Sequence, residues 1–298
     1  MLFSDKSVSD KRKDFRKALK SNKLLRFPGA FSPIVSLLIE EIGFDGIYIS
    51  GGVLSNDLGF PDVGLTTLTE VAKRGSDIAR VSALPSIIDA DTGFGEAMSA
   101  ARTIQEFENA GLCGCHFEDQ VNPKRCGHLD NKQLVDTAEM KQKITSAAKG
   151  KRDENFLIIA RTDARASEGL DKAIDRAKAY VDSGAEMIFP EALQDESEFE
   201  AFRKALSVPL LANMTEFGKS KLLDTKQLES LGYNLVIYPV TTLRLALKAV
   251  EDGLRHIKDK GGQEDILNQM QTRKRLYELL DYESYETFDK DVFNFKLK

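Results

Sequence analysis

The chain has 298 residues, a length that suits two average domains or one α/β barrel of about 250 residues. Its composition, 42% apolar and 30% charged, is typical of a soluble globular protein and excludes intrinsic disorder. A net charge of −5 argues against a dedicated binder of nucleic acid or of acidic membranes, and no apolar run approaches the roughly 20 residues that span a bilayer. Three cysteines do not suggest a disulfide framework, and residues 1–20 lack the apolar core of a secretory peptide, so we expect a cytoplasmic enzyme.

In chain order, the dominant feature is a repeated pattern of an amphipathic helical stretch, a glycine and a short apolar run. A glycine just past a helix takes the left-handed conformation that ends the last turn, and a buried parallel strand follows. Apolar residues at helical spacing precede two of these glycines, over residues 97–107 and 170–181. The glycines that mark the pattern are Gly43, Gly111, Gly184 and Gly232.

Eight short apolar runs predict eight strands. Helical stretches separate most of them, which is the pattern of right-handed βαβ units. Eight such units favour a closed (β/α)8 TIM barrel over an open doubly wound sheet, and no glycine-rich dinucleotide motif follows the first strand. We therefore predict a single α/β barrel domain over residues 1–298. The predicted strands are 25–30, 46–50, 86–89, 114–118, 156–161, 187–191, 209–213 and 235–238.

Residues 262–298 form a predicted C-terminal helical extension that a barrel does not need. The extension carries apolar and aromatic side chains, among them Leu276, Tyr285 and Phe293. Such a surface is typical of a segment that packs on a neighbouring subunit, so we expect a homo-oligomer. Packing across the bottom of its own barrel is the alternative.

Polar residues gather where the predicted strands end, which in (β/α)8 barrels is where the active site lies. Each residue alone could cap the following helix, because Ser, Asp and Asn favour the position before the first helical residue. The joint pattern over six strands is hard to explain by capping. The residues are Ser50, Gly51, Gly52, Asp89, Asp91, Glu118, Arg161, Glu191, Asn213 and Thr215.

Asp89 and Asp91 form the predicted metal site. Residues two apart on a strand point to the same side, so both carboxylates can share one cation. Carboxylates with few nitrogen or sulfur neighbours suit Mg²⁺, or Mn²⁺, with waters completing the octahedron. Asp62, Glu118 and Asp119 are available from neighbouring loops and strengthen this interpretation. A capping Asp beside a salt-bridged Asp is the alternative.

The segment from Lys124 to His128 reads Lys-Arg-Cys-Gly-His and is the most informative in the chain. Two cations and a histidine around Cys126 would lower the pKa of the thiol and make it a ready proton donor or nucleophile. Gly127 lets the backbone approach a ligand closely. We predict a mobile loop over the barrel mouth, and the alternative is a solvated basic loop with an incidental cysteine.

The other candidates are cations and buried polar residues. Arg161 is the expected partner of a substrate carboxylate, because its planar fork donates two parallel hydrogen bonds. Arg244 and Arg273 are further candidates for the same task. Cys113 and Cys115 are interpreted as small buried residues rather than a redox or metal pair.

These motifs resemble the isocitrate lyase and phosphoenolpyruvate mutase superfamily, and within it the 2-methylisocitrate lyases. The resemblance spans almost the whole chain, from Phe27-Pro28-Gly29-Ala30 to Met270-Gln271-Thr272-Arg273. Its most specific element is the run 124–128, since lyases of this superfamily carry K-[KR]-C-G-H and the phosphonomutases lack that cysteine.

The resemblance implies Mg²⁺-assisted, retro-aldol-type cleavage of the tricarboxylate 2-methylisocitrate to pyruvate and succinate, as in the methylcitrate cycle of propionate catabolism. It implies metal ligation by Asp89 and Asp91, with Asp62 and Glu118 acting through waters. The implied catalytic residues are Cys126 as the proton donor, Tyr48 as a candidate base, Lys124 and His128. The implied substrate contacts are Ser50, Gly51, Gly52, Cys126, Gly127, Arg161, Glu191, Asn213, Thr215, Arg244 and Arg273.

The resemblance also implies a homotetramer whose subunits exchange the C-terminal helix. An isocitrate lyase is the first alternative, but these tend to place a tryptophan where this chain has Phe189, and a smaller ring favours the methylated substrate. A phosphonomutase or a phosphonopyruvate- or oxaloacetate-type hydrolase would not need Cys126. A thiol-dependent aldolase for another hydroxy acid and a non-enzymatic interaction protein complete the alternatives.

Overall fold

The computed structural model describes residues 4–21, 23–125, 127 and 132–293. Eight parallel strands form two hydrogen-bonded groups, β1-β8-β7 and β2-β3-β4-β5-β6. Parallel bridges from Gly29 to Tyr48 and from Ile188 to Leu210 join the groups, so the ring closes in chain order as a (β/α)8 barrel. The strands are β1 (Leu25–Pro28), β2 (Ile47–Ile49), β3 (Ser86–Asp89), β4 (Gly114–Glu118), β5 (Leu157–Thr162), β6 (Met187–Pro190), β7 (Leu211–Asn213) and β8 (Leu235–Tyr238).

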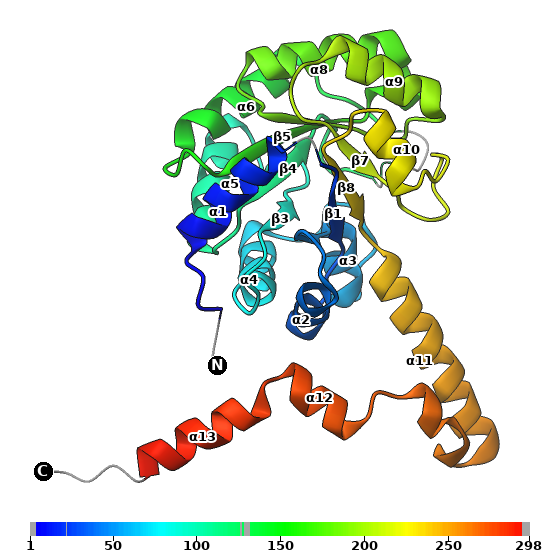
Figure 1. Cartoon of the computed structure of the whole chain (residues 1–298). Helices are drawn as coiled ribbons and strands as arrows, with labels where there is room; N and C mark the ends of the chain where they lie inside the picture. The colour runs from blue at the N-terminus through cyan, green and yellow to red at the C-terminus, as the bar shows by residue number, and fades with distance from the viewer. Residues whose placement is uncertain (1–3, 22, 126, 128–131, 294–298) are drawn as a thin grey trace, which may run out of the picture.

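Helices surround this ring, as Figure 1 shows. All eight predicted strands are confirmed, with ends within two residues of the predicted ones. The helices are α1 (Val8–Leu19), α2 (Pro33–Ile42), α3 (Gly51–Asp57), α4 (Leu68–Ala79), α5 (Ala97–Asn109), α6 (Thr137–Gly150), α7 (Ala164–Glu168), α8 (Leu170–Asp182), α9 (Glu196–Ala205), α10 (Thr225–Ser230), α11 (Thr241–Lys260), the 3₁₀ helix η1 (Glu264–Gln269), α12 (Arg273–Leu279) and α13 (Tyr282–Phe293). None of these helices is long and apolar enough to cross a membrane.

The glycines that end the helices have the predicted backbone. Gly43 has φ +88°, and Gly111, Gly184 and Gly232 also have positive φ. Only glycine takes this conformation without a steric cost, which is why the same residue recurs before β2, β4, β6 and β8. The repeated pattern in the sequence therefore reports the barrel directly.

The inside of the barrel is filled by large side chains from the strands, including Phe27 on β1, Ile159 on β5 and Phe189 on β6, all fully buried. Helix α1 closes the bottom by inserting Phe15 into the same cluster. Lys11 also anchors this helix, since its buried Nζ donates to the backbone carbonyl of Ala79 at 3.2 Å. The bottom of the barrel is thus covered by the N-terminal helix and not by the C-terminal extension.

Helix α11 leaves the barrel, and the C-terminal extension follows it through η1, α12 and α13 (Figure 1). An ion pair of 2.8 Å between Arg275 on α12 and Glu41 on α2 links the extension back to the barrel. Several apolar residues of the extension are exposed, for example Leu267 at 57% and Phe288 at 48%. We call this extension, residues 262–298, the arm.

Candidate active site

Asp89 and Asp91 lie side by side at the end of β3, as the sequence predicts, but strand alternation is not the reason. Asp89 is the last residue of the strand, and Asp91 follows with a left-handed backbone, φ +47°. The N–H of Asp91 donates to Asp89 Oδ1 at 3.0 Å, which folds the turn back on the strand. A Cβ on Gly51 would lie 3.0 Å from Asp89 Oδ2 and 3.1 Å from Asp91 Oδ1. Both carboxylates therefore face the turn after β2, where only glycine leaves them room.

Lys124 connects this aspartate pair to Asp62. Its Nζ lies 2.5 Å from Asp62 Oδ1 and 2.8 Å from Asp91 Oδ1, and the side chain is buried. Burial opposes the charge, but Glu118, Asp91 and the other nearby acids hold the pKa of Lys124 well above its usual value. Lys124 is thus a fixed cation over the predicted metal residues.

Arg161 also lies at the mouth, at the end of β5. Its Nε lies 2.9 Å from Asp163 Oδ2 and 3.3 Å from Glu118 Oε2, and its Nη1 lies 3.3 Å from Glu191 Oε2. The guanidinium also stacks over the ring of Phe189, with 5.0 Å to the centroid. The sequence predicts Arg161 as a partner for a substrate carboxylate. In the structure three carboxylates already hold the guanidinium, so a bound carboxylate has to share it.

Gly127 places the predicted loop directly against Arg161. A Cβ on Gly127 would lie 2.2 Å from Arg161 Nη2 and 2.6 Å from Glu191 Cγ. Lys132 donates to the carbonyl of Gly127 and, at 2.8 Å, to Asp163 Oδ1. The loop backbone therefore reaches the mouth, as predicted. Two predicted catalytic residues of this loop lie outside the described residues, Cys126 and His128.

Tyr48 lies deeper, on β2, with its Oη 2.7 Å from His116 Nε2. His116 is on β4, and its Nδ1 lies 3.7 Å from Asp89 Oδ1. Burial lowers the pKa of His116 to about 4, so the ring is neutral at pH 7, and burial raises the pKa of Tyr48 well above its usual value. The sequence analysis did not include His116 in the site. Its position two residues before Glu118 on the same strand is the signal that could have placed it there, because residues two apart on a strand point to the same side.

The neighbouring strands β3 and β4 together offer a set of buried atoms that suits a cation. Ligand atoms of Asp89, His116 and Glu118 lie within 4.8 Å of one another. Within the described part of the chain, Glu118 Oε2 and His116 Nδ1 are buried and form no hydrogen bond. Buried polar atoms are otherwise almost always hydrogen-bonded, so these donors fit a divalent ion near Asp89.

Asp119 does not belong to this set, although the sequence analysis counted it among the acids available to a metal. It points outward, where its Oδ2 accepts hydrogen bonds from Thr162 Oγ1 at 2.8 Å and Tyr180 Oη at 2.7 Å. Its Oδ1 accepts from the N–H of Asp163 at 2.9 Å. Alternation along β4 explains the difference, because Glu118 points into the mouth and the next residue points away. Asp119 braces β5 and α8.

The remaining predicted residues lie either at the mouth or at its edge. Ser50 and Asn213 lie at the mouth: Ser50 caps α3 by accepting from the N–H of Val53, and Asn213 Nδ2 donates to Glu191 Oε2 at 3.2 Å. Arg244 lies at the edge, with its Nη1 3.5 Å from Thr215 Oγ1 and 2.6 Å from Glu216 Oε2.

Gly52 and Arg273 differ most in their distance from the aspartates. A Cβ on Gly52 would lie 3.1 Å from Asp62 Oδ2, so Gly52 is close to the aspartates. Arg273 is exposed at the start of α12, in the arm, and the fold of one chain does not bring it to the mouth (Figure 1).

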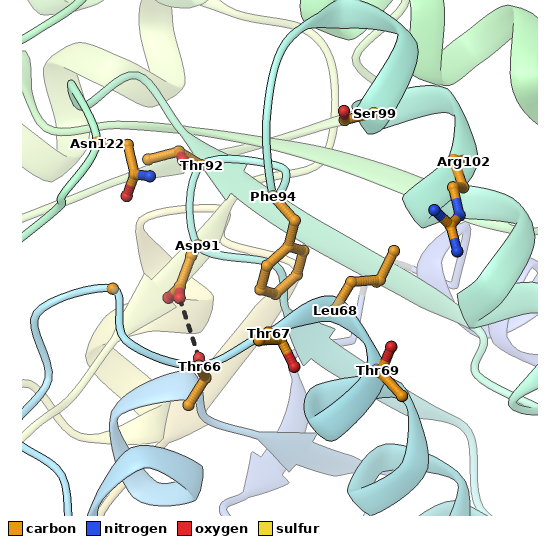
Figure 2. A pocket seen from close by; sticks show the side chains of 11 residues that line it. Thr66, Thr67, Leu68, Thr69, Asp91, Thr92, Phe94, Ser99, Arg102 and Asn122 are labelled. Carbon is orange, nitrogen blue, oxygen red and sulfur yellow. Dashed lines mark hydrogen bonds between the residues drawn. The ribbon is translucent and has the colours of Figure 1, made fainter.

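A cavity of about 360 Å³ lies on the outer side of Asp91. Figure 2 shows Phe94 and Leu68 along its wall and Thr66 donating to Asp91 Oδ2 at 3.4 Å. Asn122, from the segment that carries Lys124, is also part of the lining. Asp91 is thus reached from the mouth and from this cavity.

A buried group of carboxylates and two cations at the mouth of a (β/α)8 barrel defines an enzyme site for a small anionic substrate. Cys113 and Cys115, by contrast, are buried free thiols away from this group, as predicted, and burial raises the pKa of Cys113 to about 11. The chain belongs to the phosphoenolpyruvate phosphomutase family, whose model matches residues 15–258.

Relatives with curated names support a narrower group. A protein of Corynebacterium glutamicum called probable 2-methylisocitrate lyase 2 is 57% identical over 99% of this chain and 96% of its own length. The 2-methylisocitrate lyase of Aeropyrum pernix is 47% identical over 93% of this chain and 89% of its own length. The match therefore extends across bacteria and archaea and over nearly whole proteins.

Solved structures agree on the fold. Oxaloacetate acetylhydrolase in complex with 3,3-difluorooxalacetate has a TM-score of 0.91 and 30% identity, with 98% of this chain and 100% of that chain covered. Phosphonopyruvate hydrolase in complex with oxalate and Mg²⁺ has a TM-score of 0.86 and 29% identity, with 94% and 98% covered. The predicted barrel and superfamily are confirmed.

Proposed function

We propose that this protein is a carbon–carbon lyase that cleaves 2-methylisocitrate to pyruvate and succinate with the help of Mg²⁺ or Mn²⁺. The observation that carries the proposal is the pairing of Asp89 with Asp91 beside the buried cation Lys124. Lys124 stands two residues before Cys126 in the sequence. The 57% identity to a probable 2-methylisocitrate lyase over 99% of the chain supports the choice of substrate. A phosphonomutase has no use for the thiol of Cys126.

Asp89 and Asp91 would hold the divalent ion, with Glu118 and Asp62 reaching it through water. Their carboxylates are the oxygen donors that Mg²⁺ prefers, and Glu118 Oε2 is a buried acceptor without a hydrogen bond among the described residues. A divalent ion bound there would supply a Lewis acid for the oxygens of a 2-hydroxy acid. Mg²⁺ in the phosphonopyruvate hydrolase complex is consistent with this assignment.

The chain's own residues would bind the carboxylates and move the protons. Lys124 and Arg161 are buried cations that different carboxylates hold at the mouth, so they would orient a multiply charged substrate there. Tyr48 is the candidate base for the substrate hydroxyl, and its Oη is held 2.7 Å from His116 Nε2. After the C–C bond breaks, Cys126 would protonate the carbon that keeps the electron pair, giving succinate.

The remaining predicted residues would serve the substrate or the thiol. His128 would assist Cys126 as a nearby donor or acceptor. The turn Ser50-Gly51-Gly52, together with Gly127, Glu191, Asn213, Thr215 and Arg244, would line the substrate site. Arg273 would reach such a site only from another subunit, since within one chain it stands on the arm.

Product analysis tests the proposal. The protein should release pyruvate and succinate from 2-methylisocitrate in a reaction that stops when EDTA removes the metal, and isocitrate should be cleaved more slowly. Phosphonopyruvate and oxaloacetate are the matched comparison substrates; faster turnover of either one would overturn the assignment. The Cys126→Ser variant should keep substrate binding and lose at least about 100-fold in turnover, the usual scale for a proton-transfer group.

We also propose that the arm, residues 262–298, extends the single barrel domain and packs on another copy of the chain in a homotetramer with exchanged C-terminal helices. The exposed apolar residues of η1 and α13, together with those of α11, the helix that leads to the arm, support this arrangement, because water-exposed patches of that kind mark interaction sites. A cytoplasmic location and a role in propionate catabolism through the methylcitrate cycle complete the proposed function. Nucleic acid and membrane are not among the proposed partners.

A further inference from the structure

Gln120 follows β4 and stands at the start of the segment that carries Lys124. Its side chain is buried, with 1% exposed. Its Oε1 accepts a hydrogen bond from the backbone N–H of Arg125 at 2.9 Å, and its Nε2 donates to the backbone carbonyl of Arg125 at 2.9 Å. Nε2 also donates to Glu118 Oε1 at 3.1 Å. One amide therefore pairs with both backbone groups of Arg125 and with one oxygen of Glu118.

The orientation of this amide is fixed by its partners. A primary amide has one acceptor oxygen and two N–H donors, and here all three functions are used. Turning the amide by 180° would set Oε1 against the carboxylate of Glu118 and against the carbonyl of Arg125. Both contacts would be repulsive, so only one orientation satisfies the site.

The backbone beside Gln120 fixes both ends of the same segment. The N–H of Val121 donates to the carbonyl of Gln133 at 2.8 Å, and the N–H of Val135 donates to the carbonyl of Asp119 at 2.9 Å. Gln120 itself forms an antiparallel bridge with Leu134. Backbone hydrogen bonds thus join residues 119–121 to residues 133–135, and the side chain of Gln120 adds two hydrogen bonds to the backbone of Arg125.

Two groups of the mouth depend on this pairing. Arg125 is the neighbour of Lys124, whose Nζ lies between Asp62 and Asp91, so holding the backbone of Arg125 also holds that cation in place. The bond from Gln120 to Glu118 Oε1 leaves Oε2 as the oxygen that faces Arg161 at 3.3 Å. A single buried side chain sets the position of both.

We propose that Gln120 is a positioning residue: it locks the segment 121–125 onto the barrel mouth and fixes which oxygen of Glu118 is presented there. The consequence for turnover rests on the proposed function, whereas the locking of the segment does not. The two parts can therefore be measured separately.

The test uses the full-length chain and trypsin. Gln120→Glu keeps the shape and the acceptor for the Arg125 N–H, but it removes both donors and places a negative charge beside Glu118. Gln120→Met removes all three bonds at similar volume. Gln133→Glu is the matched control, because it makes the same chemical change at an exposed position of the backbone strand that pairs with Gln120. Cleavage after Arg125 is followed by mass spectrometry under native conditions.

Both Gln120 variants should be cleaved after Arg125 at least about tenfold faster than the wild type and the control, because buried hydrogen bonds that hold the segment are gone. Cleavage at other sites should stay unchanged, a pattern that general destabilisation does not produce. Variants cleaved after Arg125 at the wild-type rate would overturn the proposal. If Gln120→Glu does not fold, Gln120→Asn, which is too short to reach all three partners, decides the question in its place.

Turnover of 2-methylisocitrate gives the second readout. The Gln120→Glu variant should lose at least about tenfold in kcat, with KM changed much less, because misplaced catalytic groups weaken the transition state more than the bound substrate. Normal kcat in a variant with fast cleavage would overturn the catalytic part of the proposal. A wild-type protein without lyase activity would defeat the proposed function, and the trypsin result would still decide the locking role.

Discussion

Replacing Gly127 with alanine is the most direct perturbation of the loop at the mouth. The change adds one methyl group to a residue whose backbone lies against Arg161. The new Cβ would stand 2.2 Å from Arg161 Nη2, 2.6 Å from Glu191 Cγ and 2.9 Å from Asp163 Oδ1, where ordinary contacts measure 3.4–4 Å. The added methyl group therefore overfills the space between the backbone of Gly127 and the side chains of Arg161, Glu191 and Asp163.

The size of the effect follows from what surrounds Arg161. Three ion pairs to Glu118, Asp163 and Glu191 hold the guanidinium, so it cannot move aside without breaking at least one of them. Overpacking a well-filled site costs about 1–3 kcal/mol, which corresponds to about 5- to 150-fold in an equilibrium. The loop can avoid the clash by leaving the mouth, so the cost should appear in its closure and not in global stability.

The assay compares kcat/KM and the midpoint of thermal unfolding for Gly127→Ala and for Gly262→Ala. Gly262 is the control, because a Cβ there meets no atom within 4 Å. We expect kcat/KM of Gly127→Ala to fall by about 10- to 100-fold with a melting temperature close to that of the wild type. The control should match the wild type in both measurements. A Gly127→Ala enzyme with unchanged kcat/KM would show that the backbone at Gly127 does not press on Arg161 during turnover.

Three further predictions concern the metal, the brace behind the mouth and the arm. Saturating Mg²⁺ should stabilise the wild type by about 2.7 kcal/mol at 100 times the dissociation constant and so raise its melting temperature; Asp89→Asn should abolish that rise, and a retained rise would place the metal elsewhere. Tyr180→Phe removes the 2.7 Å bond to Asp119 and should lower the free energy of unfolding by about 1–3 kcal/mol, measured by urea titration, and an unchanged midpoint would refute the brace. Deletion of 262–298 should lower the mass in sedimentation, and an unaltered profile would contradict packing between copies.

The strands and their order could be predicted because one local rule repeats. Four of the strands, β2, β4, β6 and β8, follow a helix whose end is marked by a glycine, and glycine is the residue that tolerates the left-handed turn. Gly43 and Gly184 illustrate the rule at φ +88° and +113°. Local conformation and the global fold point to the same answer in this chain, which is why the sequence pattern sufficed.

The contacts within the site could be predicted only where alternation along a strand decides them. Glu118 faces the mouth and Asp119 faces away, which a strict count of two along β4 would have shown in advance. The turn at Asp91 is different, because its φ of +47° depends on a bond back to Asp89 and on the space that Gly51 leaves. Such a turn is a tertiary property that spacing does not encode.

The ion pairs of Arg161 could not be predicted from the sequence either. An arginine at a strand end looks free to bind a carboxylate, but here Asp163, two residues further on, and Glu191, after the next strand, already form ion pairs with it. Sequence distance does not reveal which acids surround a cation, because the closed barrel brings residues from all strands to one ring. The arm shows the same limit, since Arg273 matches a motif and still stands far from the mouth in one chain.

The balance of charge at the mouth gives the physical reason to expect a cation there. The carboxylates outnumber the cations: Asp62, Asp89, Asp91, Glu118, Asp163 and Glu191 stand against Lys124, Lys132 and Arg161. Burial, reinforced by neighbouring acids, raises the pKa of Asp91 to about 6 and that of Glu118 well above its usual value. A buried excess of negative charge costs free energy unless protons or a metal ion offset it. Six carboxylates against three cations leave three negative charges when all are ionised. A divalent ion held by Asp89 and Asp91 would offset two of them, at the place where a hydroxy acid would need a positive charge beside its oxygens.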